Sequence, residues 1–353
     1  MQLSEIYNQV GPWLDPKGPR SEVVITSRIR LARNIVGFTF LSQASAAQQN
    51  ELLQFVHEKI METELRDGIW FVNMEDISPL ERQMLTERHL ISKQLAEEEG
   101  PRGVMLMQDE SLAMMVNEED HLRIQAMSSG LQLQRLYERI SRVDDLLESR
   151  MEFAFSPQYG YLTACPTNVG TGIRVSVMLH LPALKMTGQM EKVFRAARDL
   201  HVAVRGFYGE GSEPIGDLFQ ISNQTTLGKT EEGIIEELIR QAIEPVIEYE
   251  LRARKKILEE RLPALDDKIY RALGVLDNAR LISSEETMYL LSYLRLGVHM
   301  ERIKTISLET INRLFFFTQP GHLQHLNRKK LDTQQRDQAR ADFIRRELHA
   351  SRN

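Results

Sequence analysis

Carboxylates beside an arginine form the first stretch of the chain that could do chemistry. The sequence VNEEDHLR at residues 116–123 places three consecutive carboxylates just ahead of Arg123. A guanidinium group holds its proton with a pKa above about 12, so it must be oriented and must lose a proton before it can act as a nucleophile. Carboxylates suit both tasks, because they pair with the guanidinium fork and accept protons. Glu119 and Glu210, in a later glycine-containing loop, are the candidates. A solvated charge cluster is the alternative for the acidic run.

A cysteine followed by a glycine-rich turn forms the second stretch. Residues 165–174 read CPTNVGTGIR, and Cys165 is the one cysteine of the chain. A thiol in a loop over a pocket, beside arginines, would have a lowered pKa, and its thiolate could pair with a guanidinium. The alternative is a small buried hydrophobe, and the local chemistry leaves both open.

Five arginines stand at strand ends or loop junctions near these stretches: Arg28, Arg30, Arg123, Arg174 and Arg205. Alternation along a strand puts the first two on one face. Each guanidinium fork can bind two oxygens, so the set could surround a polyphosphate. For any one of them, a solvated or salt-bridged surface role is the alternative.

Two other nucleotide-binding motifs, the P-loop and the kinase-type glycine loop, are incomplete in this sequence. Gly228-Lys229-Thr230 has the ending of a P-loop, but position 223 is Asn where that motif needs Gly. The kinase-type glycine loop is absent as well, because position 214 is Pro.

Hydrophobic patterning predicts the elements that position these residues. Helices are expected over residues 47–66, 79–95, 131–148 and 190–200, the second carrying His89. Strands are expected over residues 23–25, 69–72, 103–107, 112–116, 161–163, 175–179, 201–208 and 218–222. The first 20 residues are expected to be a loosely held lead-in.

The residue pattern changes after Thr230: patterns typical of strands are no longer found, and patterns typical of helices continue to the last residue. We therefore expect an α+β catalytic domain over residues 1–230, with a mostly antiparallel sheet flanked by helices, and an all-helical domain over residues 231–353. The apolar run at residues 314–317 could be core or could support a homo-oligomer, and core is the favoured interpretation.

Composition limits the class of protein. The 353 residues are 42% hydrophobic and 27% charged, which is typical of a globular protein, and the net charge of −6 argues against direct nucleic-acid binding. No signal peptide or membrane span is evident. A single cysteine fits a reducing cytoplasm, and no Cys/His pair has zinc spacing.

At these motifs the sequence resembles the phosphagen (guanidino) kinases, the family of creatine and arginine kinases. Four motifs occur in the family's order: SRIR at 27–30, NEEDH at 117–121, CPTNVGTG at 165–172 and RGFYGE at 205–210. The resemblance covers about residues 20–230. It implies ATP as phosphoryl donor, with Mg²⁺ held mainly by the nucleotide phosphates and by no dedicated protein ligands.

The resemblance also implies roles for single residues. Glu119 and Glu210 would hold the acceptor guanidinium, with Cys165 beside it. ATP contacts would fall on Thr26, Ser27, Arg28, Ile29, Arg30, His89, Arg123, Arg174, Val175, Ser176, Val177, Met178, Arg205, Gly206, Phe207, Tyr208, Gly209 and Glu210.

The chain departs from the small-molecule enzymes at both ends. Those enzymes carry a helical N-terminal domain ahead of the Ser-Arg motif, which here begins at residue 27, so we expect no such domain and a site open to an arginine within a polypeptide. The helical C-terminal region has no counterpart in them. In both respects the chain is similar to the bacterial protein-arginine kinases, which implies transfer of the ATP γ-phosphoryl group to protein arginines. A free-arginine kinase and a non-catalytic phosphoarginine-reading adaptor are the alternatives.

The C-terminal region contains RDQARA at residues 336–341. On a helix, Arg336 and Arg340 lie one turn apart with Asp337 close to both, which alone favours an exposed helix with an internal salt bridge. The resemblance instead implies a phosphoarginine-binding site. It further implies McsA as activator, degradation of marked proteins by ClpC–ClpP, and the repressor CtsR as a target.

Overall fold

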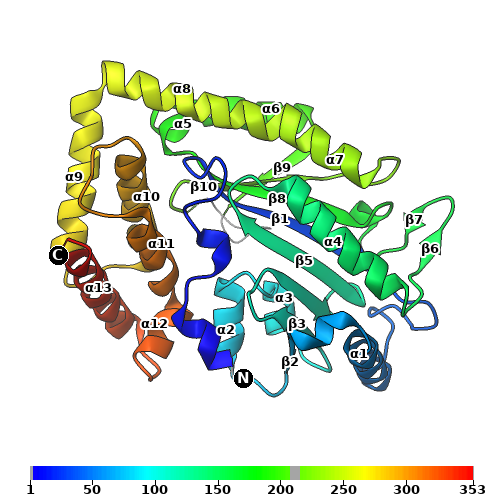
Figure 1. The fold of residues 1–353 in the computed structure, drawn as a ribbon. Coiled ribbons are helices and arrows are strands. Elements are labelled where there is room, and N and C mark those ends of the chain that lie inside the picture. Colours follow the sequence, from blue (N-terminus) through cyan, green and yellow to red (C-terminus); the bar gives the residue numbers. More distant parts are fainter. Residues whose placement is uncertain (1–2, 207–214, 353) are drawn as a thin grey trace.

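An antiparallel sheet lies at the centre of the molecule (Figure 1). The computed structural model describes residues 3–206 and 215–352, and in this part of the chain eight strands form one sheet in the order β2-β3-β4-β5-β1-β8-β10-β9. All of its neighbouring strands pair antiparallel. The strands are β1 (Val24–Arg33), β2 (Ile69–Asn73), β3 (Gly103–Met107), β4 (Leu112–Val116), β5 (Leu122–Ser129), β8 (Ile173–His180), β9 (Val202–Arg205) and β10 (Leu218–Asn223), and β6 (Phe155–Ser156) and β7 (Gly160–Tyr161) form a separate short hairpin. The predicted mostly antiparallel sheet is confirmed.

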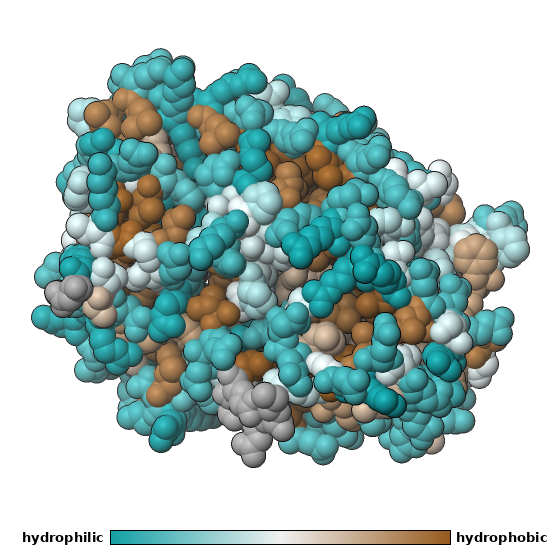
Figure 2. Space-filling view, viewed as in Figure 1, coloured by the Kyte–Doolittle hydropathy of each residue, from teal (hydrophilic) through white to brown (hydrophobic). Residues whose placement is uncertain are grey.

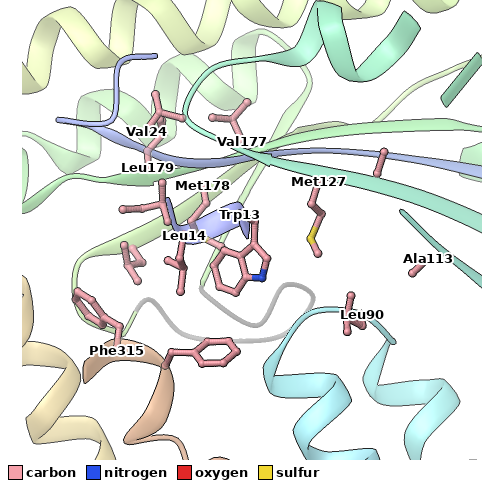
Figure 3. Close-up of a cluster of buried hydrophobic side chains, with 14 of the residues drawn as sticks. Trp13, Leu14, Val24, Leu90, Ala113, Met127, Val177, Met178, Leu179 and Phe315 are labelled. Carbon is pink, nitrogen blue, oxygen red and sulfur yellow. The ribbon is translucent and has the colours of Figure 1, made fainter. Parts of the chain in front are cut away.

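The two faces of the sheet differ in chemistry. Successive side chains of a strand point to opposite faces, and β1 alternates apolar residues such as Ile29 with Arg28 and Arg30. In Figure 3, Val177 lies on one side of the sheet, whereas Met127 and Met178 lie on the other side beside Trp13. The registers place Arg28 on the side of Met127, so the arginines share a face with Trp13.

Helices cover the apolar face. The helix α4 (Leu133–Glu148) lies over β1 and β5, as Figure 1 shows, and its residues at spacings of three and four are buried. The other helices of this part are α1 (Ala46–Met61), α2 (Pro79–Glu87), α3 (Lys93–Glu97), α5 (Pro182–Met186) and α6 (Met190–Asp199). Helix α1 begins with a capping box formed by Ser45 and Gln48.

The single helix predicted over residues 79–95 is wrong. Helix α2 ends at Glu87, and Ser92 caps a second helix by accepting a hydrogen bond from the backbone of Leu95. His89 lies between the two helices with a φ of 57°, in the left-handed region that helices do not use. The break turns His89 away from a helix surface and into the interior.

The first 20 residues are not a loose lead-in, which corrects a second prediction. Two short 3₁₀ helices, Leu3–Asn8 and Pro12–Leu14, place Tyr7 and Trp13 in the core with only 2% of each side chain exposed. Trp13 packs edge-on against Phe316, with ring centroids 6.2 Å apart, and Figure 3 shows it between the sheet and the helix that carries Phe315. Hydrophobic burial therefore holds this segment between two parts of the chain.

The chain after Thr230 is helical in its described part, as predicted. Its helices are α7 (Glu231–Glu237), α8 (Glu244–Glu260), α9 (Leu262–Asn278), α10 (Ser284–His299), α11 (Leu308–Phe317), α12 (Pro320–Leu326) and α13 (Thr333–Ala350). The Thr230 side chain caps α7, and a π-helical turn, Leu238–Ile243, joins α7 to α8 just ahead of Pro245. Proline has no N–H to donate to a preceding turn, which accounts for the irregular turn there. Phe315, Phe316 and Phe317 are core residues, as favoured.

A buried carboxylate fastens the C-terminal helices to the rest of the molecule. Glu87, at the end of α2, accepts hydrogen bonds from the backbone N–H groups of Gly321 and His322 at the start of α12, at 2.7 and 3.1 Å. Negative charge is stabilised at a helix N-terminus, where N–H groups lack partners. The adjacent residue, Arg88, is fully buried and pairs with Glu110. The division at residue 230 stays a prediction.

The surface is dominated by polar side chains. On the face shown in Figure 2, hydrophilic residues surround separate, smaller hydrophobic areas. Within the described residues, no helix combines the length and the apolar character that crossing a membrane requires.

Replacing Trp13 with alanine is expected to destabilise the protein by about 3–5 kcal/mol, because the change removes a fully buried indole and leaves a cavity between the sheet and α11. Urea unfolding measures the change. The control is Phe155→Ala, since Phe155 is 57% exposed and its loss is expected to change the unfolding free energy by less than about 0.5 kcal/mol. Equal effects of the two changes would contradict the placement of Trp13.

Candidate active site

Four arginines converge on the face of the sheet opposite α4. Arg28 and Arg30 lie on β1, and Arg174 of β8 stands directly opposite Arg30. Arg123 of β5 stands opposite Ala32, two positions along the same face. Residues opposite one another on adjacent strands have Cβ atoms about 5 Å apart, so these side chains form one group. We call this surface the arginine face.

Neutral groups orient two of these arginines. Arg28 donates from Nη2 to Oε1 of Gln220 at 2.8 Å and from Nε to Oγ of Ser176 at 3.4 Å. Arg174 donates from Nη2 to Oγ of Ser222 at 3.2 Å. Hydrogen bonds to neutral acceptors fix the direction of a guanidinium without cancelling its charge. The charge of Arg28 is therefore not cancelled by these two contacts.

Burial and mutual repulsion make this face a strong anion site. Burial, together with the charges of Arg174 and Arg123, lowers the pKa of Arg28 to about 10. Burial and the charges of Arg28, Arg123 and Arg174 also lower the pKa of Arg30. The Nε atom of Arg30 is buried and has no hydrogen-bond partner among the described residues. A polyphosphate here would supply both opposite charge and acceptors, so the residues present fit the phosphates of ATP.

A neutral histidine and a tryptophan lie beside Arg28. Burial, and secondarily the charge of Arg28, lowers the pKa of His89 to about 3, so the imidazole is uncharged at neutral pH. Its ring packs edge-on against Trp13, with centroids 5.0 Å apart. The break between α2 and α3 thus places His89 at the edge of the arginine face, where a flat base could pack, with the buried Trp13 behind it.

The acidic motif forms a tight loop between β4 and β5. Arg123 donates to Oε1 of Glu118 at 2.7 Å and to Oε2 of Glu119 at 2.7 Å. Burial would lower the pKa of Arg123, but the charges of Glu118, Glu119 and Asp120 outweigh it and raise that pKa. Glu118 is almost completely buried, whereas 36% of the Glu119 side chain is exposed. Glu119 is therefore the carboxylate that can reach a ligand.

Arg33 anchors the cysteine loop, which comprises residues 165–172. Arg33 donates to the carbonyl oxygens of Ala32 and Thr171, at 3.0 Å each, and pairs with Asp144 of α4. Gly172 has a φ of 66°, and a Cβ there would lie 2.6 Å from Nη1 of Arg33, so only glycine fits this close approach. Cys165 begins the loop, half-buried, with Sγ 3.0 Å from Oγ1 of Thr167.

Several predicted nucleotide residues point elsewhere. The side chains of Ser27, Ile29, Val175 and Val177 alternate with the arginine face and lie on the apolar face, so they support the site from behind. Thr26, Ser176 and Met178 share the arginine face. Arg205 ends β9 opposite Gln220, on that same face, and Gly206 is buried. Four predicted residues lie outside the described part of the chain: Phe207, Tyr208, Gly209 and Glu210.

Sequence reasoning missed four residues that build the site. Gln220 and Ser222 orient arginines from β10, and alternation along the predicted strand 218–222 could have found them. Glu118 holds Arg123 and also accepts a hydrogen bond from the backbone of Glu119 at 2.8 Å. No local sequence pattern predicted the placement of Trp13, because the residues that it contacts are distant in sequence.

The residues proposed to read phosphoarginine lie apart from this site, on α13. Arg340 is buried and donates to the carbonyl oxygens of Thr318 and Ile282 and to Asp337 at 2.7 Å. Arg336 is half-buried and donates to the carbonyl oxygen of Leu331 at 2.8 Å. Figure 1 shows α13 at the far side of the helical region from β2. The internal Arg340–Asp337 pair is present, and Arg340 also joins α13 to its neighbours.

The described residues contain no cluster of three or more His, Cys, Asp or Glu side chains that could hold a metal ion. The side chains of the arginine face cannot be Mg²⁺ ligands, because positively charged guanidinium groups do not coordinate cations. Mg²⁺ would fit this site through the oxygens of a bound nucleotide.

Comparisons with known proteins agree with this geometry. The model of the ATP:guanido phosphotransferase C-terminal catalytic domain matches residues 51–253. The duplicated taurocyamine kinase from Schistosoma mansoni, solved with bound transition state analog components, superimposes with a TM-score of 0.60 and 27% identity, covering 68% of this chain and 34% of that chain. Lombricine kinase superimposes with a TM-score of 0.59 over 71% of this chain and 72% of its own, and at 24% identity it shows the fold alone. Fold and site together define a guanidino phosphotransferase.

Further sequence matches assign the chain to a narrower group within the guanidino phosphotransferases. The model of the protein-arginine kinase McsB C-terminal domain matches residues 263–353. The protein-arginine kinase of Halalkalibacterium halodurans is 44% identical over 344 residues, 97% of this chain and 96% of that protein. The protein-arginine kinase of Bacillus subtilis is 43% identical over 351 residues, 99% of this chain and 96% of that protein. The chain belongs to the protein-arginine kinases of the ATP:guanido phosphotransferase family.

Lowering the pH from about 7 to 5 is expected to reduce the free energy of unfolding more steeply in the wild type than in His89→Gln. The His89 pKa is about 3 in the folded protein and about 6.5 in an unfolded chain, so the unfolded state binds one more proton in this window. The stability contributed by the neutral ring is complete above about pH 6.5 and is lost as the pH falls toward 3, by at most about 1.4 kcal/mol per pH unit.

Urea unfolding at pH 7, 6 and 5 measures this dependence. The exposed residue His349 supplies the control, since His349→Gln is expected to keep the wild-type pH dependence. An unchanged slope in His89→Gln would contradict the buried neutral state of His89.

Proposed function

We propose that this chain transfers the γ-phosphoryl group of ATP to arginine side chains of proteins. The buried arginine face, where neutral Gln220 and Ser176 orient Arg28, supports a polyphosphate donor. The acidic loop and the half-buried Cys165 support a guanidinium acceptor. The names of relatives that match almost the whole chain support a protein as the carrier of that guanidinium.

One observation carries the proposal. Arg123 belongs to the arginine face by its place on β5, yet its guanidinium contacts Glu119, the exposed carboxylate of the acidic loop, at 2.7 Å. The donor side and the acceptor side therefore meet at one residue. A phosphoryl group passing between them would travel only the short distance that in-line displacement needs.

On the donor side, Arg28, Arg30, Arg123, Arg174 and Arg205 are proposed to bind the phosphate oxygens. Arginine forks fixed in advance stabilise charge that develops on the transferred group, and they need no rearrangement during the reaction. Mg²⁺, held mainly by the nucleotide phosphates, would supply further positive charge. His89, which packs against the buried Trp13, would lie near the base or ribose.

On the acceptor side, Glu119 is proposed to orient the guanidinium and to accept one of its protons. As the bond from nitrogen to the γ-phosphorus forms, the bond from that phosphorus to the bridging oxygen of ADP breaks, and the nitrogen proton passes to the carboxylate. Glu210, outside the described residues, is assigned the same role. A Cys165 thiolate would add negative charge beside the guanidinium.

Replacing Glu119 with alanine is expected to lower turnover on a protein substrate by at least about 100-fold, because both the orienting group and the proton acceptor are lost. Nucleotide affinity is expected to stay within a few-fold of wild type. Transfer of labelled phosphate and nucleotide titration measure the two quantities. The control is Glu51→Ala on the exposed side of α1, which is expected to leave both unchanged. Wild-type turnover in Glu119→Ala would remove this residue from the mechanism.

Two other functions give different outcomes in one experiment. The protein is incubated with ATP and either free arginine or an unfolded protein, and the products are analysed by mass spectrometry for acid-labile phosphate on arginine. A protein-arginine kinase marks the unfolded protein. Efficient use of free arginine would favour a small-molecule kinase, and no mark on any substrate would favour an adaptor that only binds phosphoarginine.

We also propose that Arg336, Asp337 and Arg340 bind phosphoarginine, with the arginines facing the phosphate and the carboxylate facing the guanidinium. Arg336→Ala is expected to weaken binding of free phosphoarginine about tenfold or more, the usual effect of losing a charged hydrogen bond. Calorimetric titration measures the affinity. Arg346→Ala, on the exposed side of the same helix, is the matched control.

If phosphoarginine activates the kinase through this site, Arg336→Ala is also expected to lose that activation. Activation that persists unaltered in the variant would refute the link between the two sites.

The wider role follows from the same proposal. A cytoplasmic protein-arginine kinase of this kind would mark proteins for degradation by ClpC–ClpP, would be activated by McsA and would inactivate the repressor CtsR. Its substrates would be proteins with accessible arginines. The match of residues 263–353 to the C-terminal domain model supports this assignment over that of a metabolite kinase.

A further inference from the structure

Asp120 is the carboxylate of the acidic motif that the proposed mechanism does not use. It is fully buried, and its Oδ1 atom accepts hydrogen bonds from the backbone N–H of Ala164 at 2.6 Å and from Nδ2 of Asn34 at 2.7 Å. Its Oδ2 atom is also buried and has no hydrogen-bond partner among the described residues. A buried carboxylate is costly when neutral amides are its hydrogen-bond donors, so its position calls for an explanation.

Asn34 extends this contact into a network of three segments. Its Oδ1 atom accepts from the backbone N–H of His121 at 2.9 Å, and its Nδ2 group donates to the carbonyl oxygen of Leu162 at 3.0 Å as well as to Asp120. Asn34 directly follows β1, which carries two arginines of the arginine face. The acidic loop, the end of β1 and the segment before the cysteine loop are thus joined by two buried side chains.

The ring of His121 strengthens the same junction. Its Nδ1 atom accepts from the backbone N–H of Ile35 at 3.0 Å, and its Nε2 atom lies 3.0 Å from the carbonyl oxygen of Thr39. Because Nδ1 accepts, the neutral ring carries its proton on Nε2 and donates it to Thr39. Burial lowers the pKa of His121, which favours this neutral form. The acidic loop is therefore anchored on both sides of Asp120.

The two residues proposed to contact the acceptor guanidinium are neighbours of this junction. Glu119 directly precedes Asp120, and Cys165 directly follows Ala164. The bond between Asp120 and Ala164 consequently sets the spacing between Glu119 and Cys165. Misplacement of a reacting group by about 1 Å can cost about 100-fold in rate, so such a bond can control turnover without touching the substrate.

We propose that Asp120 is a positioning residue, which ties the acidic loop to the cysteine loop so that Glu119 and Cys165 face one guanidinium. The inference rests on the proposed phosphoryl transfer to arginine. Asn34 is its partner in the same role. Since the Asp120 side chain has no exposed surface, it acts through Ala164 and Asn34 and not on the substrate directly.

Two substitutions at this position separate positioning from direct use of the charge. Asp120→Ala removes the acceptor for Ala164 and Asn34, and it is expected to lower kcat about 100-fold while nucleotide affinity stays within about threefold. Asp120→Asn keeps an oxygen in the Oδ1 position, so it is expected to recover at least a third of wild-type kcat. Wild-type kcat in Asp120→Ala, or an Asp120→Asn variant as impaired as Asp120→Ala, would overturn the proposal.

Alkylation of Cys165 gives a second measurement that does not depend on turnover. Cys165 is the one thiol of the chain, so iodoacetamide reports on its loop alone. Releasing Ala164 is expected to change the alkylation rate at least threefold in Asp120→Ala and to leave it near wild type in Asp120→Asn. Identical alkylation rates in the wild type and in both Asp120 variants would overturn the inference, whether or not the wild type phosphorylates proteins. Failure of the wild type to phosphorylate any protein would instead contradict the proposed function.

A third variant keeps the test open if Asp120→Ala does not fold. Asn34→Ala removes the links from this side chain to Asp120, His121 and Leu162 but leaves the bond between Asp120 and Ala164, so a drop in kcat of about tenfold is expected. Thermal melting of each variant identifies those that remain folded. Wild-type kcat and alkylation in a folded Asn34→Ala would contradict the network.

Discussion

Arg123 lies where two opposite sets of charge meet, and the arrangement of the site depends on how that residue is held. Burial opposes its charge, while Glu118, Glu119 and Asp120 favour it, and the carboxylates prevail. Without this acidic loop, four guanidinium groups would share one buried face of the sheet with neutral partners such as Gln220 and Ser222. The loop thus makes a crowded cationic surface compatible with folding, and it leaves Arg28 and Arg30 available to a polyanion.

The same ion pairs explain why the proposed donor side and the proposed acceptor side are adjacent. Glu118 is buried and structural, whereas Glu119 is partly exposed and can reach a ligand, although the two are consecutive. Their difference comes from the tight loop between β4 and β5, in which Glu118 accepts the backbone N–H of Glu119. A short turn therefore assigns two carboxylates of the same type to separate tasks.

Local sequence patterns predicted most of the strands, but not β5, which carries Arg123. They also predicted that Arg28 and Arg30 share a face, because alternation along β1 is a property of a few adjacent residues. The same patterns failed where distant contacts decide the structure. Periodicity continued a helix through His89, but the cap at Ser92 and the burial of His89 against Trp13 break it. Trp13 lies in a polar, proline-rich stretch, and its burial depends on Phe316 about three hundred positions away. The contact between Asp120 and Ala164 could not be predicted either, because no local sequence pattern connects those two positions.

The docking of the first residues has a consequence for synthesis of the chain. Leu14 accepts a hydrogen bond from Asn312, and Trp13 packs on Phe316. Domains generally begin to fold from the N-terminal side while translation continues. Here Trp13 and Leu14 cannot complete these contacts until α11, about 300 residues later in the chain, has also emerged. The indole of Trp13 therefore stays without this partner until most of the described chain has been made.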